Sequence, residues 1–190
     1  MATLLTHGLV GAVLARNPQA DARQRRRLLL TAAFCAMLPD IDVIGLRLGV
    51  PYGSLWGHRG MTHSLVFAAT AGAVAACFVV RKTSERLRLT LLLFAITASH
   101  GLLDALTDGG FGVAFFSPFD RTRYFFPVTP ISVSPIGLTQ IFSSSGLTVI
   151  WTEIIWVWLP MMVVARVMSR FRHTSSPQAE GKAQSASADR

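Results

Sequence analysis

The stretch Ser99 to Thr107 (SHGLLDALT) places ionisable side chains at the end of an apolar run that begins near Leu87. His100 and Asp104 are four residues apart, so on a helix they lie on one face. An imidazole and a carboxylate that faced lipid would be costly, and both should therefore point into a protein interior. Such a pair supplies two metal ligands, or one ligand and the residue that orients it.

The rest of the chain supplies further side chains of the same types. Four of the five histidines belong to this set, and the fifth, His173, lies in a polar C-terminal stretch. Imidazole and carboxylate ligands together suit Zn²⁺, Mn²⁺ or Fe²⁺. The set has no thiolate and more ligands than one ion needs, which favours a reactive centre of one or two ions over a closed structural site. The candidate metal ligands are His7, Asp40, Asp42, His58, His63, His100 and Asp104.

The elements that position these residues are expected to be membrane helices. Of the 190 residues, 51% are apolar and only 15% are charged, and the mean hydropathy is +0.45. Apolar segments alternate with short basic stretches, which is typical of an all-α polytopic membrane bundle. The formal charge of +8 is explained by these basic flanks, which set topology and meet anionic lipid, so we expect a lipid partner and no nucleic acid.

About four to five transmembrane or re-entrant segments are expected. Their ranges are 3–15, 28–50, 63–80, 89–107 and 147–168.

The first segment has no basic region before it, as a signal peptide would require, and is interpreted as a retained short or tilted helix. Pro39 should kink or end the second helix. Residues 1–172 are expected to form one membrane-embedded domain, and 173–190 a disordered cytoplasmic tail.

Two stretches between the apolar segments are predicted to be loops. Residues 51–62 are rich in glycine, and His58 and His63 are five apart, so at least one of them should lie on a loop. Residues 108–146 contain too many prolines to span a membrane and carry many phenylalanines. We interpret this segment as an interfacial or re-entrant loop that can cover a site.

Three residues inside apolar segments need a separate interpretation. Glu153 either faces the bundle or lies near the membrane interface, and the interface is favoured. Cys35 and Cys77 are interpreted as small packing residues and not as a disulfide.

The distribution of basic residues predicts the topology. Basic stretches fall at 16–27, 81–88 and 166–172, so the N-terminus should lie outside and the C-terminus inside. This assignment does not use the candidate ligands, yet it places all seven toward the outer ends of their segments. We therefore expect one site at, or just within, the outer face of the membrane.

Four motifs in this order resemble the YdjM-type bacterial inner-membrane proteins, a family described as membrane-bound metal-dependent hydrolases. They are His7, the LPDID stretch (38–42), the HRGMTHS stretch (58–64) and the HGLLDALTDGG stretch (100–110). The PFDRTRYFFP stretch (118–127) also looks like the loop that follows the motifs in that family. The resemblance covers about residues 1–130 and implies a multi-pass inner-membrane protein.

The order of the motifs is more distantly reminiscent of the zinc-dependent phospholipase C and P1-type nuclease group, helical enzymes that cleave phosphoesters. That resemblance implies metal ligation by His7, Asp40 or Asp42, His58 or His63, His100 and Asp104. The group has a further downstream histidine with a second histidine or a carboxylate, whereas this sequence has no histidine between 100 and 173. One or two ions are therefore expected in place of three.

The expected chemistry is hydrolysis of a lipid- or envelope-linked ester, with a phosphoester favoured because arginines lie near the metal set. A metal with an open position polarises a phosphoryl or carbonyl oxygen and activates water. Asp40 or Asp42 could bridge two ions or act as general base. Arg59 could contact a phosphate bidentately. Arg121 and Arg123 could do the same from the long loop, or anchor lipid headgroups.

Two other classes of function use the same cluster. An ion transporter would also place His and Asp within membrane spans, but it would need polar residues that continue toward the cytoplasmic ends, and those halves are apolar. A non-catalytic membrane protein stabilised by a bound metal is the second alternative.

Overall fold

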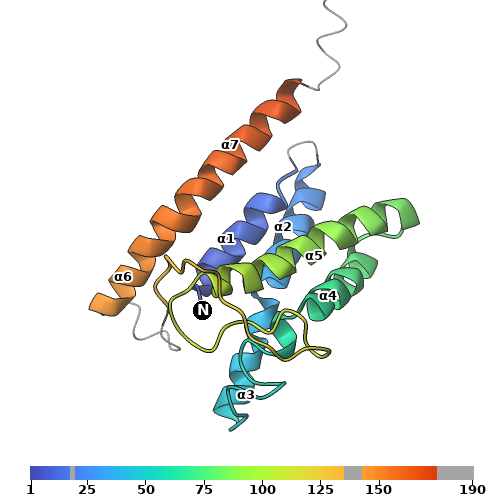
Figure 1. The fold of residues 1–190 in the computed structure, drawn as a ribbon. Coiled ribbons are helices and arrows are strands. Elements are labelled where there is room, and N and C mark those ends of the chain that lie inside the picture. The colour runs from blue at the N-terminus through green and yellow to red at the C-terminus, as the bar shows by residue number, and fades with distance from the viewer. Residues whose placement is uncertain (18–19, 135–142, 175–190) are drawn as a thin grey trace, which may run out of the picture.

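The computed structural model describes residues 1–17, 20–134 and 143–174, and over these residues the chain is a helical bundle with a loop cap at one end (Figure 1). This confirms the all-α prediction. Besides the helices, the described residues contain two isolated β-bridges, Thr107 with Ile131 and Val113 with Tyr124. The helices are α1 (Leu4–Leu14), α2 (Ala22–Met37), η1 (Leu38–Asp42), α3 (Val43–Arg47), η2 (Met61–His63), α4 (Leu65–Val79), α5 (Thr83–Ala105), α6 (Ser144–Glu153), η4 (Ile154–Trp158) and α7 (Leu159–Thr174).

Three helical stretches in the described part of the chain are long and apolar enough to cross a membrane. They are Ala22–Arg47, Thr83–Ala105 and Ser144–Arg170. The first predicted segment forms the 11-residue helix α1, as expected for a short or tilted helix, and α4 has 15 residues. The predicted tail lies outside the described residues from 175 onward.

Small residues set the contacts between the helices. A Cβ atom on Gly72 of α4 would lie 2.7 Å from the backbone nitrogen of Phe94 on α5. A Cβ atom on Gly11 of α1 would lie 2.8 Å from the Cβ atom of Ala36 on α2. Only glycine permits backbones to approach this closely, which is how membrane helices pack without large side chains between them.

The proline in the second segment has the predicted effect. Helix α2 ends at Met37, and the five residues from Leu38 to Asp42 form a 3₁₀ turn with Pro39 near its start. The proline ring cannot supply a backbone N–H, so the α-helical ladder stops here. The turn holds Asp40 and Asp42 in the interior, where both are buried.

The start of α4 is fixed immediately after His63. Ser64 is the N-cap residue, and its Oγ accepts the backbone N–H of Phe67 at 3.1 Å. This cap satisfies one of the free N–H groups at the helix start. His63 is thereby held at the junction between the 51–60 loop and the bundle, whereas His58 lies on the loop, as the spacing of the two histidines predicted.

Residues 106–134 cross the end of the bundle as an extended loop, which with residues 48–60 we call the cap (Figure 1). The backbone N–H of Asp108 donates to the carbonyl of Ile131 at 3.0 Å, and Val113 and Tyr124 exchange two backbone hydrogen bonds. The N–H of Leu65 on α4 donates to the carbonyl of Phe115. The prediction of a covering loop holds for the described part, and residues 135–142 lie outside it.

Candidate metal centre

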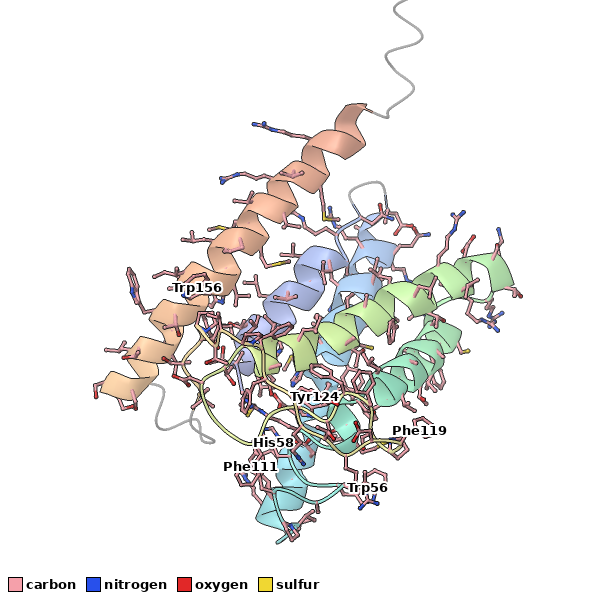
Figure 2. All side chains as sticks on the ribbon, in the orientation of Figure 1. Trp56, His58, Phe111, Phe119, Tyr124 and Trp156 are labelled. Atoms are coloured by element: carbon pink, nitrogen blue, oxygen red, sulfur yellow. The ribbon has the colours of Figure 1, made fainter. Side chains whose placement is uncertain are left out.

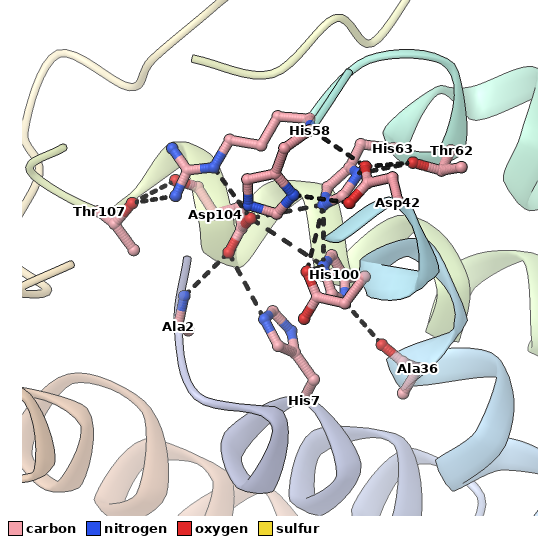
Figure 3. A network of polar contacts seen from close by, with 12 residues as sticks. Ala2, His7, Ala36, Asp42, His58, Thr62, His63, His100, Asp104 and Thr107 are labelled. Carbon is pink, nitrogen blue, oxygen red and sulfur yellow. Dashed lines mark hydrogen bonds and ion pairs between the residues drawn. The ribbon is translucent and has the colours of Figure 1, made fainter. Parts of the chain in front are cut away.

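All seven candidate ligands converge into one buried network, drawn from four separate parts of the chain (Figure 3). His7 comes from α1. His100 and Asp104 come from the C-terminal end of α5, one turn apart as predicted. The other four lie on η1 (Asp40, Asp42), on the loop (His58) and on η2 (His63).

Four of these residues surround a common centre, and His7 lies against two of them. The ligand atoms of Asp40, His63, His100 and Asp104 all lie within 4.8 Å of one another. His63 Nε2 lies 3.0 Å from His100 Nε2 and 3.5 Å from Asp104 Oδ2. His7 adds a fifth group, because its Nε2 lies 3.5 Å from Asp104 Oδ1 and its ring stacks on that of His100 with centroids 3.6 Å apart. The arrangement is that of side chains directed at one small volume.

Two members of the group have buried polar atoms whose nearest charged neighbours, at 3.4–3.8 Å, make no hydrogen bond to them. Both ring nitrogens of His7 and both carboxylate oxygens of Asp40 lack a hydrogen-bond partner in the described part of the chain. A buried carboxylate or imidazole without a partner is strongly unfavourable. A cation between these groups would satisfy the unpaired oxygens and one ring nitrogen at once, so the residues fit a metal ion.

The histidines are also oriented in the manner of metal ligands. His100 Nδ1 lies 2.7 Å from the carbonyl oxygen of Ala36. A carbonyl only accepts, so Nδ1 carries the proton and the lone pair of Nε2 points at the centre. His63 Nδ1 lies 3.2 Å from Asp42 Oδ2, which likewise directs its Nε2 inward.

The two aspartates of η1 differ in their partners. Asp42 Oδ1 pairs with His58 Nδ1 at 2.6 Å. Its Oδ2 accepts from the hydroxyl of Thr62 at 2.6 Å and from the backbone N–H of Arg59 at 3.2 Å. Asp42, His58 and His63 form a second group of possible metal ligands, but their facing atoms already make close pairs. Asp40 is therefore the η1 carboxylate that is free to bind an ion.

Arg59 is fully buried and has a left-handed backbone with φ of 62°. Its Nε donates to Asp104 Oδ2 at 3.1 Å, and its two terminal nitrogens donate to Thr107 Oγ1 and to the carbonyl of Gly109. These contacts direct the guanidinium at the cluster, where it compensates the charge of Asp104. The predicted contact of Arg59 with a substrate phosphate stays a prediction.

The two arginines of the long loop differ from one another. Arg121 is exposed. The guanidinium of Arg123 donates to the backbone carbonyls of Tyr52, Ser54 and His58 at 2.9–3.2 Å. Arg123 therefore joins the two halves of the cap.

The favoured interpretation of Glu153 was wrong, because this side chain is fully buried against α1. Its carboxylate accepts from the backbone N–H and hydroxyl of Thr3 and from the hydroxyl of Thr6. The backbone N–H of Ala2 donates to Asp104 Oδ1 at 2.9 Å. Glu153 and Asp104 thus hold the start of α1 from two sides, which positions His7. A single carboxylate in an apolar segment was the one signal of this role.

Comparison with known proteins agrees with the membrane architecture. The model of the family described as "YdjM inner membrane protein" matches residues 1–174. The curated "Inner membrane protein YbcI" of Escherichia coli (strain K12) is 38% identical over 166 residues, which cover 86% of this chain and 95% of that protein. No solved structure matches the chain. These comparisons support an inner-membrane location and are silent on a hydrolase activity or a phospholipase C or P1 nuclease relationship.

Proposed function

The chain belongs to the YdjM inner membrane protein family, and we propose that it is a membrane-embedded, metal-dependent hydrolase of a lipid- or envelope-linked ester. The observation that carries the proposal is the set of buried atoms without a hydrogen-bond partner on His7 and Asp40, at a cluster of four converging ligand groups that His7 adjoins. Buried polar groups without partners destabilise a fold unless a ligand satisfies them. A divalent cation has the charge and the ligand preference that this set requires.

The proposed ligands are His7, Asp40, His63, His100 and Asp104. Zn²⁺ suits this mixture of imidazole and carboxylate best, and Mn²⁺ and Fe²⁺ accept the same donors. A second ion at Asp42, His58 and His63 would have to replace the 2.6 Å contact between Asp42 and His58. We therefore favour one ion per chain.

When bound, the ion would polarise a phosphoryl or carbonyl oxygen and activate water. Asp40 is the ligand nearest the molecular surface, with 5% of its side chain exposed against 0% for His63, His100 and Asp104. Substrate would approach on this side.

Among the side chains next to the cluster, His58 has the orientation best suited to proton transfer. Asp42 pairs with its Nδ1, which fixes the imidazole so that Nε2 would accept the proton as general base. The ring of His58 lies 5.4 Å from that of His63, centroid to centroid. Asp42 then acts through His58 and His63 as a positioning residue.

The activity test uses detergent-purified full-length protein supplied with Zn²⁺ or Mn²⁺. Fluorogenic phosphodiesters and acyl esters carried in mixed micelles are the substrates. We expect turnover that EDTA abolishes and that added metal restores. The His58→Gln variant should show lower turnover with its metal content unchanged. Lys82→Ala, an exposed change at the opposite end of α5 from His100 and Asp104, is the matched control. Metal-loaded protein that turns over neither class of ester would contradict the proposal.

A further inference from the structure

The distance along each helix from its basic end to the cluster measures how deep the cluster lies in the membrane. Arg27 on α2 and Arg88 on α5 are exposed and lie toward the starts of these helices, whereas the cluster residues lie toward or beyond the far ends. The start of α2 lies at the end of the bundle away from the cap (Figure 1). At 1.5 Å per helical residue, Asp40 lies about 20 Å from Arg27 and His100 about 18 Å from Arg88. The hydrocarbon core of a bilayer is about 30 Å thick. Helix tilt shortens both distances along the membrane normal. The cluster therefore lies at most about 20 Å along the normal from the basic helix ends.

The last helical stretch provides an independent measure. From Ser144 to its first basic residue, Arg166, the α6–η4–α7 stretch is about 33 Å long, which matches a full span. Glu153 lies on this stretch about 20 Å from Arg166. Glu153 binds Thr3, and the neighbouring Ala2 binds Asp104. The cluster therefore lies at about the depth of Glu153, which agrees with the distances from Arg27 and Arg88. Roughly 10 Å of hydrocarbon then lies beyond it.

The cap and α3 lie beyond the cluster, and large apolar side chains are exposed on them. Leu48, Trp56 and Phe119 are 79%, 64% and 87% exposed. Figure 2 shows Trp56, Phe111 and Phe119 projecting outward from the cap. Large side chains of this kind would be unfavourable in water but are suited to the acyl chains and the membrane interface.

The backbone of the cap is satisfied in the way that hydrocarbon demands. Irregular backbone is tolerated at membrane depth only where its polar groups find partners inside the protein. The single guanidinium of Arg123 satisfies the carbonyls of Tyr52, Ser54 and His58. A second guanidinium, that of the fully buried Arg59, satisfies the carbonyl of Gly109. The turn at Asp120 and Thr122 is polar and exposed, which marks the part of the cap that meets the headgroups.

We infer that the cap is immersed in the leaflet opposite the basic helix ends, with its aromatic side chains against lipid, so that the His–Asp cluster is an intramembrane site. The partner that this surface fits is a bilayer lipid. The inference concerns depth and does not rest on the proposed hydrolase activity. If that activity holds, the substrate is an amphiphile whose reactive bond lies near the junction of headgroup and acyl chain.

Spin-label accessibility tests this placement. With Cys35 and Cys77 changed to alanine, single cysteines at Trp56 and Phe119 are labelled with a nitroxide in reconstituted vesicles. Collision with oxygen reports hydrocarbon, and collision with a water-soluble nickel chelate reports water. Trp151→Cys, on the exposed face of α6 at the depth of the cluster, is the matched hydrocarbon control. Arg23→Cys, at the basic end of α2, is the aqueous control.

We expect the oxygen-to-nickel ratio at both cap positions to exceed that at position 23 several-fold and to approach that at position 151. Ratios at both cap positions that equal the ratio at position 23 would overturn the inference, because the cap would then stand in water. Both sites are exposed, so labelling should not perturb the fold. Neither metal content nor turnover enters the readout, so this inference and the proposed function can fail separately.

Discussion

The Nε2 atoms of His63 and His100 face one another at 3.0 Å between the carboxylates of Asp40 and Asp104. Each ring is held from its other side, His100 by the carbonyl of Ala36 and His63 by Asp42. With both rings neutral and protonated at Nδ1, the two Nε2 lone pairs would repel one another, whereas one cation can accept both. This relationship supports a metal centre more directly than the number of histidines does.

The two aspartates of η1 should respond differently to replacement by asparagine. Asp40 is a proposed ligand, whereas Asp42 orients His63 and His58. Loss of an orienting partner lowers metal affinity by about 10–100-fold, and we expect Asp40→Asn to lower it further. Isothermal titration calorimetry of each metal-stripped variant with Zn²⁺ measures the two affinities. Equal affinities in the two variants would show that the assigned roles are wrong.

Arg59→Met should destabilise the protein strongly. The guanidinium of Arg59 is fully buried against Asp104, and its removal leaves a buried carboxylate uncompensated. Breaking such a pair costs about 3–5 kcal/mol. Thermal unfolding in detergent with EDTA present measures the effect without a metal contribution. Arg121→Met is the control, and a melting temperature that is the same in both variants would contradict this account of Arg59.

Removal of the Glu153 side chain should loosen the start of α1. Glu153→Ala leaves the backbone N–H of Thr3 and the hydroxyl of Thr6 without their buried acceptor. The expected cost is about 1–3 kcal/mol for each unsatisfied group. Hydrogen exchange at residues 3–7 should rise, and Glu153→Gln, which retains an acceptor oxygen, should recover part of the protection. Unchanged exchange in Glu153→Ala would show that Glu153 does not hold α1.

Gly72→Leu should separate α4 from α5. A Cβ atom at this position would already lie 2.7 Å from the backbone of Phe94, and the larger side chain forces the helices apart. Overpacking of this kind costs about 1–3 kcal/mol. Val74→Leu, on the exposed face of the same helix, should be neutral. Thermal unfolding of the two variants side by side makes the comparison, and equal stability would contradict the packing described for α4.

Some of this architecture was predictable from the sequence. The four-residue spacing of His100 and Asp104 determines their common face, and the basic loops place all seven candidates toward one end of the bundle. The different contacts of Asp40 and Asp42 were not predictable, because they depend on the 3₁₀ geometry of residues 38–42. The role of Glu153 depends on Thr3 and Thr6, about 150 residues away, and no local pattern records such a contact.

Metal content is the measurement that tests the central claim most directly. Full-length protein is purified in detergent, supplied with Zn²⁺, freed of excess metal and analysed by elemental mass spectrometry beside His63→Ala, His100→Ala and Arg121→Ala. We predict about one ion per chain in the unchanged protein and in Arg121→Ala, as one proposed site requires, and loss of the ion from both histidine variants. Folded, unchanged protein that retains no metal, or histidine variants that retain all of it, would contradict the account.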